Sequence, residues 1–131
     1  MTMIPTDCYY TKEHEWVRLD GATFVVIGIT EFAQDQLGDV IYVNLPEIGS
    51  EIQQFAQMGE AESVKAVSDL FSPVTGTVVE VNSNLQDTPE LVNQDPYGEG
   101  WMLKVELSGT EQLSKLLSSD QYSDFLDSGE H

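Results

Sequence analysis

Residues 60–73 read E-A-E-S-V-K-A-V-S-D-L-F-S-P. Two extended arms, Glu60–Val64 and Val67–Phe71, flank Lys65 in this stretch. None of the residue types that favour tight turns stands at the tip, so local chemistry does not by itself predict the turn. A helix over 60–71 is the alternative, but Pro73 disfavours helical geometry at Ser72. The stretch therefore favours a β-hairpin with a lysine at its tip.

Short apolar runs of the same kind recur along the chain and are separated by turn residues. Runs rich in β-branched and aromatic residues with Gly, Asn, Asp or Pro at their ends are typical of strands. On this basis we expect strands at residues 15–19, 23–29, 39–45, 51–55, 77–82 and 101–107. Gly28, inside the second of these, predicts a bulge or a close backbone approach. Residues 83–100 form a long polar connection, packed through Leu85, Leu91, Val92 and Tyr97.

Two other regions have helical patterns. Thr30 can cap a short helix that ends at Gly38. Near the C-terminus, leucines lie on one face of 111–117, and Tyr122 begins the apolar stripe of a second helix at 119–126. Residues 127–131 are expected to fray. The residues thus predict a small β-sandwich or barrel with helices attached to one side.

Composition narrows the class of protein. The chain has 131 residues, which fits one domain, and 40% of them are hydrophobic, enough for a core. Its net charge is −18 with only five Lys and Arg, which argues against nucleic acid and anionic membranes as partners. Such a charge suits partners with basic patches, or it serves solubility alone. The absence of a signal, transit or membrane-spanning pattern predicts a cytoplasmic protein, or an organellar one already processed.

The residues that carry chemistry are few. With one cysteine and two histidines, the chain has no zinc-site spacing, and it has no G-x-S-x-G or phosphate-binding loop. An acid–base hydrolase stays open only as a generic enzyme alternative. Lys65 is the only basic residue between Arg18 and Lys104, an interval that holds fourteen Asp and Glu. Acids close to Lys65 would favour its charged form, so it is either a site of covalent modification or ordinary solvated surface.

Longer motifs point to a known family. Residues 59–82, G-E-A-E-S-V-K-A-V-S-D-L-F-S-P-V-T-G-T-V-V-E-V-N, resemble the lipoyl-attachment region of the glycine cleavage H-proteins. Further matches in the same order are H-E-W-V at 14–17, I-G-I-T-E-F-A at 27–33, L-G-D-V-I-Y-V-N-L-P at 37–46 and L-V-N-Q-D-P-Y-G-E-G-W-M at 91–102. Biotin carriers usually flank their lysine with methionines, and lipoyl domains of 2-oxoacid dehydrogenases typically carry D-K-A. The segment E-S-V-K-A and its flanking motifs therefore indicate the glycine system.

The resemblance implies a fold. It is mainly β, a barrel-sandwich hybrid of the lipoyl-domain type, with a short helix after the second strand and C-terminal helices. Residues 1–131 would form a single lipoyl-carrier domain, with 110–127 as a helical extension packed on the β body. It also implies a hairpin at 60–71 with Lys65 at the tip.

The resemblance implies a carrier without catalysis of its own. Lipoate, linked to Lys65 as an amide, would take the aminomethyl group of glycine from the P-protein, a PLP-dependent glycine decarboxylase. The group would pass to the T-protein, an aminomethyltransferase, and the dihydrolipoyl form would be reoxidised by the L-protein, dihydrolipoyl dehydrogenase. A lipoate-attaching enzyme is the remaining partner, and a monomer is expected. The alternative is an H-protein-like carrier that relays lipoyl groups to other enzymes or serves another redox pathway.

Roles for individual residues follow from the same resemblance. Glu62 and Ser63 would help the lipoate-attaching enzyme to recognise the hairpin. Glu15 and Asp69 are candidates to meet the cationic amine of the loaded arm in a surface cleft, although Glu15 can also be read as a plain strand-edge acid. Glu13 stands where relatives often carry a small hydroxyl residue, so its part in this cleft is open. We expect His14 to be a structural hydrogen-bonding residue, and Trp16, Tyr97 and Trp101 to be core or cleft wall.

Overall fold

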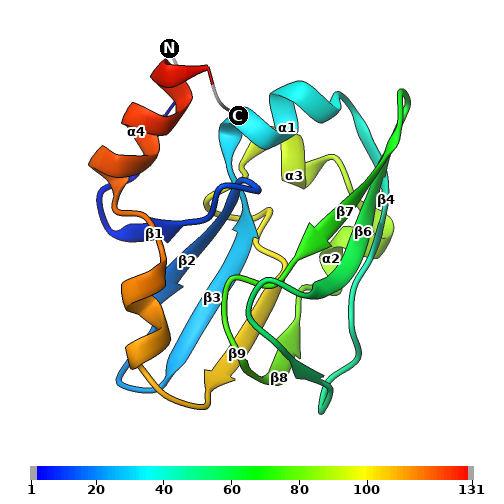
Figure 1. Cartoon of the computed structure of the whole chain (residues 1–131). Coiled ribbons are helices and arrows are strands. Elements are labelled where there is room, and N and C mark those ends of the chain that lie inside the picture. Colours follow the sequence, from blue (N-terminus) through cyan, green and yellow to red (C-terminus); the bar gives the residue numbers. More distant parts are fainter. Residues whose placement is uncertain (1–2, 130–131) are drawn as a thin grey trace.

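The computed structural model describes residues 3–129, and its strands form two sheets that lie face to face (Figure 1). The larger sheet has the strand order β1-β2-β3-β9-β8-β5 and the smaller one β4-β6-β7, with every neighbouring pair antiparallel. The larger sheet comprises β1 (Cys8–Tyr10), β2 (Glu15–Leu19), β3 (Phe24–Ile29), β9 (Leu103–Leu107), β8 (Gly76–Val81) and β5 (Glu51–Ile52). The smaller comprises β4 (Val40–Asn44), β6 (Gln57–Ser63) and β7 (Val67–Phe71). Within the described residues neither sheet closes on itself, which suits a barrel-sandwich hybrid.

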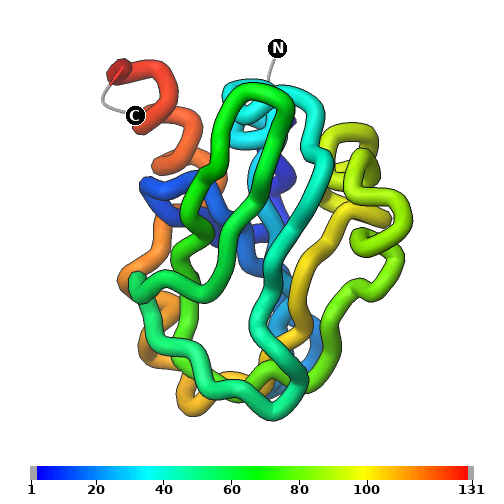
Figure 2. The backbone as a smooth tube through the Cα atoms, turned by 90° about the vertical axis from the view of Figure 1, so that its right-hand side faces the viewer, coloured from blue at the N-terminus to red at the C-terminus, as the bar shows by residue number. Residues whose placement is uncertain are grey.

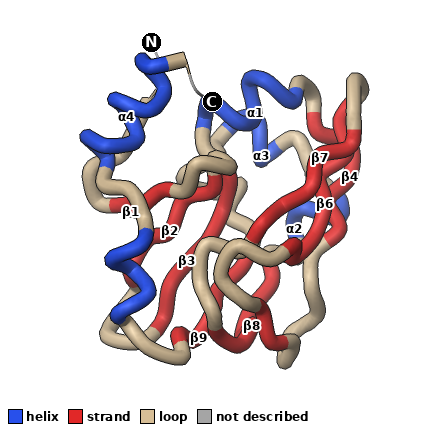
Figure 3. Tube along the Cα trace, in the orientation of Figure 1, coloured by secondary structure: helices blue, strands red, loops and turns tan. Residues whose placement is uncertain are grey.

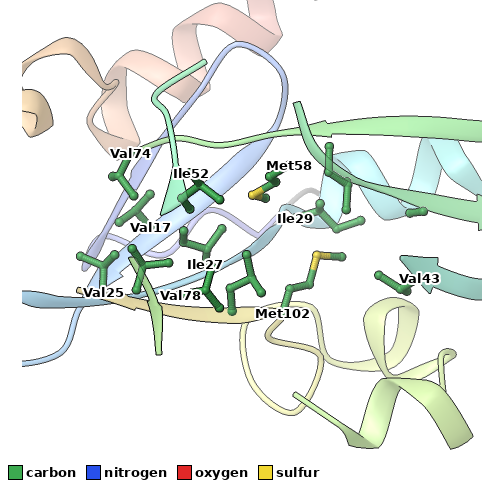
Figure 4. Packing of buried hydrophobic residues seen from close by; sticks show 14 of the residues in the cluster. Val17, Val25, Ile27, Ile29, Val43, Ile52, Met58, Val74, Val78 and Met102 are labelled. Carbon is green, nitrogen blue, oxygen red and sulfur yellow. The ribbon is translucent and has the colours of Figure 1, made fainter. Parts of the chain in front are cut away.

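Strand β3 illustrates how the sequence separates the two faces of the larger sheet. Val25, Ile27 and Ile29 alternate along it and are buried in the main core, which residues of the smaller sheet share (Figure 4). Removing each such side chain from water contributes about 1.5–3 kcal/mol. Gly28 faces the other way and leaves room for the indole of Trp16, which a Cβ at position 28 would meet at 2.7 Å. The predicted close approach at Gly28 is therefore confirmed.

A second apolar cluster lies on the opposite face of β1 and β2, against α4 (Ser119–Ser128). Tyr122 of α4 stacks on Tyr10 of β1 with ring centroids 4.7 Å apart. Trp16 is buried beside them and donates its indole N–H to the Pro96 carbonyl at 3.0 Å. Burial raises the pKa of the Cys8 thiol, in the same cluster, to about 11, so this cysteine stays protonated and unreactive.

The short helices lie at the ends and along the edges of the sheets (Figure 3). Helix α1 (Glu31–Leu37) follows the prediction, because the Thr30 hydroxyl accepts from the Ala33 N–H and the chain leaves the helix at Gly38. Two helical turns, α2 (Asn84–Asp87) and α3 (Leu91–Gln94), lie in the connection that was expected to be irregular. They bury Leu85 and Val92, and this packing was predicted even though the turns were not.

The structure corrects several predicted elements. Strand β1 was missed, so α1 follows the third strand rather than the second. The strand expected at 51–55 ends at Ile52, and β9 begins at Leu103 instead of 101. Residues 111–115 form a 3₁₀ helix (Glu111–Lys115) rather than an α-helix. Helices also lie beside both sheets, with α4 next to β1 and α2 next to β4, and not on one side only.

The C-terminal helix is longer than its sequence pattern predicted. Ser118 and Gln121 form a reciprocal capping box at its start, and Gly129 ends it in the left-handed conformation. Asp127 and Ser128 are therefore helical rather than frayed, while residues 130–131 lie outside the described part. None of the helices in residues 3–129 is both long and apolar enough to cross a membrane.

Candidate functional site

Strands β6 and β7 form the predicted hairpin, and Lys65 lies in the turn that joins them (Figure 2). The Ser63 N–H donates to the Ala66 carbonyl at 2.8 Å. The Ser63 hydroxyl accepts from the N–H groups of Lys65 and Ala66 at 3.1 and 3.2 Å. A serine hydroxyl that accepts from these backbone N–H groups plays the part that an Asn or Asp side chain plays in other turns. Ser63 thus shapes the turn that presents Lys65.

The lysine itself is exposed and rests against the end of α1. Its stem lies across Gly38, where a Cβ would stand 2.8 Å from the lysine Cε. The neighbouring Val64 N–H donates to the Asp39 carbonyl at 3.1 Å, so the hairpin tip is docked on the segment between α1 and β4. Among the described residues no carboxylate forms an ion pair with the Lys65 amine. The amine is therefore open to solvent and to a modifying enzyme.

A hollow of about 610 Å³ lies beside Lys65, between the hairpin and α1. Asp69 lines it from β7, and Glu13 and His14 line it from the segment before β2. The Asp69 carboxylate is exposed and accepts from the Gln57 side-chain amide at 3.1 Å. Two of the three expected cleft residues, Asp69 and Glu13, therefore line the same hollow as Lys65, and Glu15 does not.

Glu13 also lines a second cavity, of about 330 Å³, and Glu15 lines the same cavity. Glu15 is only 1% exposed, so it is not a solvated acid at a strand edge. Its carboxyl group accepts from the Thr11 hydroxyl at 2.6 Å and from the Phe71 N–H at 3.2 Å. Burial raises the pKa of Glu15 to about 8, although these two hydrogen bonds oppose the shift. An acid in this state ionises more readily when a cation lies beside it.

Backbone strain is concentrated along these two spaces. His14 (φ 71°) and Phe55 (φ 69°) are the non-glycine residues with positive φ in the part of the chain that the structure describes. His14 lines the first hollow and Phe55 the second cavity. A left-handed conformation costs an ordinary residue roughly 1–2 kcal/mol. Strain of this kind is kept where the surrounding structure holds it, and it is common at functional sites.

Tyr122 ties the walls of the first hollow together. Its hydroxyl lies 2.8 Å from both the His14 Nδ1 and the Thr30 hydroxyl. Thr30 caps α1, whose residues Phe32, Gln36 and Leu37 line the same hollow. The structural role predicted for His14 is confirmed, and the C-terminal helix is its partner.

The remaining predicted residues divide into two groups. Glu62 is exposed on the outer face of the smaller sheet, where it pairs with Tyr42 and Val67, whereas Ser63 is buried in the turn. Trp16, Tyr97 and Trp101 belong to the second apolar cluster or pack against it and do not line the two spaces near Lys65. Sequence reasoning missed Thr11, Phe55 and Phe71. Phe55 and Phe71 reach the cavity of Glu15 from distant parts of the chain, so nothing local marks them, whereas Thr11 is only four residues before Glu15.

Comparisons with known proteins agree over nearly the whole chain. The family model described as Glycine cleavage H-protein matches residues 8–129. A protein named glycine cleavage system H protein from Symbiobacterium thermophilum is 55% identical over 129 residues, covering 98% of this chain and 100% of its own. One of the same name from Staphylococcus haemolyticus is 53% identical over 123 residues, or 94% of this chain and 97% of its own.

A solved structure confirms the fold. The crystal structure of a glycine cleavage system H protein from Mycobacterium marinum superposes with a TM-score of 0.85 at 39% identity. The match covers 95% of this chain and 99% of that one. The prediction of a mainly β barrel-sandwich hybrid is therefore correct. By sequence and by fold, this chain belongs to the glycine cleavage H-protein family.

Proposed function

We propose that Lys65 carries a lipoyl group through an amide bond and that the chain is the lipoyl carrier of a glycine cleavage system. The observation that supports this best is the placement of Lys65. Its amine is exposed at a docked hairpin tip, beside a hollow that shares Glu13 with the cavity of Glu15. An amide needs a primary amine, so arginine could not replace this lysine. The residues present therefore fit the cofactor that the family carries.

The lipoyl group, when bound, supplies the disulfide and dithiol chemistry that accepts and releases an aminomethyl group. The protein's own residues hold the cargo. We assign Asp69 and Glu13 to the path from Lys65, and Glu15 to its end, where a carboxylate can bind the cationic amine. Because burial raises the pKa of Glu15 to about 8, its carboxyl group is mainly neutral at pH 7 until a cationic amine lies beside it and favours the carboxylate.

The hairpin offers two features to a lipoate-attaching enzyme. Glu62 presents an exposed carboxylate three residues before Lys65, which a basic enzyme surface can contact. Ser63 is buried, so it contributes by fixing the shape of the turn. We therefore keep both as recognition residues, Glu62 by contact and Ser63 through geometry.

The proposed partners are the P-protein, the T-protein and the L-protein, between which the arm on Lys65 moves. A net charge of −18 would favour encounter with partners that carry basic patches. The chain itself would not catalyse a reaction. Residues 1–131 would act as one carrier domain, with 110–127 bracing the cleft through Tyr122, as a monomer in the cytoplasm of a bacterium like those of its relatives.

Reconstitution tests this function. Lipoylated protein is mixed with P-protein, glycine and labelled bicarbonate, and exchange of the label into the glycine carboxyl is measured. We expect exchange with the native chain and with Lys104→Arg as a control, but none with Lys65→Arg. A chain lipoylated at Lys65 that supports no exchange, yet passes lipoyl groups to other enzymes, would favour the relay alternative. Hydrolytic turnover by the chain alone would favour an enzyme.

A further inference from the structure

We propose that Phe55 is the aromatic wall that shields the end of the loaded arm from water in the Glu15 cavity. The inference rests on the proposed arm at Lys65. It adds a positioning residue that neither the hairpin motif nor the expected cleft carboxylates include.

The first argument is the cost of the conformation. Phe55 has φ 69°, a region in which a bulky side chain without local hydrogen-bonding groups is rare. Its side chain is 52% exposed, so burial of the ring does not offset the strain. Glycine or asparagine at this position would adopt the same backbone more easily. A strained and half-exposed phenylalanine therefore requires a reason other than the stability of the fold.

The second argument is that neighbouring contacts fix this residue in place. The Phe55 N–H donates to the Ser72 carbonyl at 2.6 Å, and the Ser72 N–H donates to the Ala56 carbonyl at 2.8 Å. The side-chain amide of Gln54 donates to the Pro73 carbonyl at 3.0 Å. The loop before β6 is thus tied to the exit of the Lys65 hairpin on both sides of Phe55. The backbone from which the ring projects is therefore held in a defined position.

The third argument is what the ring faces. Phe55 lines the same cavity as Glu15, together with Phe71 and Leu117. The cavity thus combines the carboxyl groups of Glu13 and Glu15 with apolar walls, and Lys12 and Lys115 also line it. The carbon chain and two sulfurs of an arm end suit the apolar walls, since sulfur packs well against aromatic rings, and its cationic amine suits the two carboxyl groups.

The cavity of Phe55 and the hollow beside Lys65 share a lining residue. Glu13 lines both the hollow beside Lys65 and the cavity of Phe55. Phe71 is the last residue of β7, the strand that returns from Lys65, and its N–H binds Glu15. The occupant to which we assign this cavity is accordingly the arm of the same chain and not a separate ligand.

Shielding matters because the cargo is labile in water. An S–CH₂–NH₃⁺ group takes up one water and yields the thiol, formaldehyde and ammonium. The C–S and C–N bonds break, the water oxygen ends in formaldehyde, and no oxidant is needed. An apolar ring over the group excludes the water that this reaction consumes. Phe55 would therefore slow loss of the cargo between partners.

The test uses the whole lipoylated protein without its partner enzymes. The reduced arm is loaded chemically with formaldehyde and ammonium, which forms the aminomethyl thioether and releases one water. Intact mass then follows loss of the group in the native chain, Phe55→Gly, Phe55→Tyr and the control Ile48→Ala, an exposed apolar residue outside this cavity. In parallel, alkylation of the arm's remaining free thiol by iodoacetamide measures its accessibility.

We expect Phe55→Gly to lose the group about tenfold faster, equivalent to about 1.4 kcal/mol in the barrier, and to be alkylated faster. Its melting temperature should be equal to or above that of the native chain, because glycine relieves the strain. Phe55→Tyr and Ile48→Ala should behave like the native chain. Equal loss rates in Phe55→Gly and the native chain would overturn the inference. Failure to attach lipoate at Lys65 at all would instead overturn the proposed function, since it precedes the loading step.

Discussion

The side chain of Lys65 lies across Gly38, so closely that a Cβ at position 38 would stand 2.8 Å from the lysine Cε. Gly38 has φ 84° and ends helix α1, so two unrelated demands meet at this residue. The backbone needs a glycine to leave the helix, and the lysine needs the free space. The direction in which Lys65 projects is therefore set partly by a residue 27 positions earlier in the chain.

Gly38→Ala should lower the free energy of unfolding by roughly 1–3 kcal/mol, because φ 84° with ψ −165° is a conformation that almost only glycine adopts. It should also slow lipoylation, because its methyl group displaces the lysine stem. Gly49→Ala is the matched control, since Gly49 has φ 93° and open space where a Cβ would lie. Denaturant melts and ligase rates measured on both variants separate the two effects. Equal lipoylation rates in the two would show that Lys65 does not depend on Gly38 for its position.

The burial of Glu15 predicts a dependence of stability on pH. Its pKa is raised from 4.5 to about 8, so the folded protein binds one more proton than the unfolded chain between these values. Stability contributed by this group is complete below about pH 4.5 and falls as the pH rises through about 8. Glu15→Gln should remove this decline, which is of the order of a few kcal/mol at most.

The measurement for Glu15 is the difference in unfolding free energy between the native chain and Glu15→Gln from pH 5 to pH 9. Other titrating groups cancel in this difference, and the exposed Glu62→Gln serves as a control. A difference that stays constant across the range would mean that Glu15 ionises as readily in the fold as outside it. The same variant should also lose the aminomethyl cargo faster, because an amide binds a cation more weakly than a carboxylate.

Tyr122→Phe tests the link between the C-terminal helix and the hollow beside Lys65. The variant keeps the ring that stacks on Tyr10 but loses the hydroxyl that lies near His14 and Thr30. We expect a loss of roughly 1–3 kcal/mol in stability, because buried polar groups lose a hydrogen-bonding partner. Tyr10→Phe is the control, since the Tyr10 hydroxyl donates to the Pro5 carbonyl, away from His14. An NMR shift of the His14 ring in Tyr122→Phe but not in Tyr10→Phe would confirm the link, and an unchanged ring would refute it.

Substitutions at Glu62 and Ser63 should have different effects on stability. Glu62→Gln removes an exposed charge, so we expect slower lipoylation with stability unchanged within about 0.5 kcal/mol. Ser63→Ala leaves the N–H groups of Lys65 and Ala66 without their acceptor, so it should slow lipoylation and cost about 1 kcal/mol as well. Ligase kinetics and melts on the two variants measure both quantities. If Glu62→Gln were lipoylated at the native rate, the lipoate-attaching enzyme would recognise the turn and not this carboxylate.

Much of this architecture could be predicted where one local signal dominates. The apolar run and the Asp20-Gly21 turn signal after it placed β2 at its observed bounds, and Thr30 and Gly38 marked both ends of α1. Local sequence signals failed where contacts with distant residues determine the backbone conformation. The three residues of β1 are a strand because they pair with β2, and the turn at Lys65 forms through Ser63 and through docking on Asp39. Phe55 was predicted to be the end of a strand, but it has a left-handed conformation and its N–H donates to the Ser72 carbonyl.

The candidate site likewise contains some residues that the sequence indicates and others that only the fold identifies. Lys65 stands out in the sequence because it is an isolated cation in an acidic interval and because the motif around it resembles a known family. The acids at 13, 15 and 69 could be proposed only through that resemblance, because a chain with 23 Asp and Glu offers many equivalent candidates. The burial of Glu15 and its contact with Phe71 depend on β2 and β7 meeting in space, and no local pattern encodes such a meeting.

The proposed attachment of lipoate at Lys65 is tested by the intact mass of the protein after incubation with a lipoate ligase, ATP and lipoate. Lys65→Arg is measured alongside, and near-native melting curves establish that both proteins are folded. We predict that the native chain gains the mass of one lipoic acid less one water, and that the variant gains nothing. An unchanged native mass, with a ligase shown to be active on another acceptor, would mean that Lys65 is an ordinary exposed lysine. It would contradict the carrier function proposed for this chain.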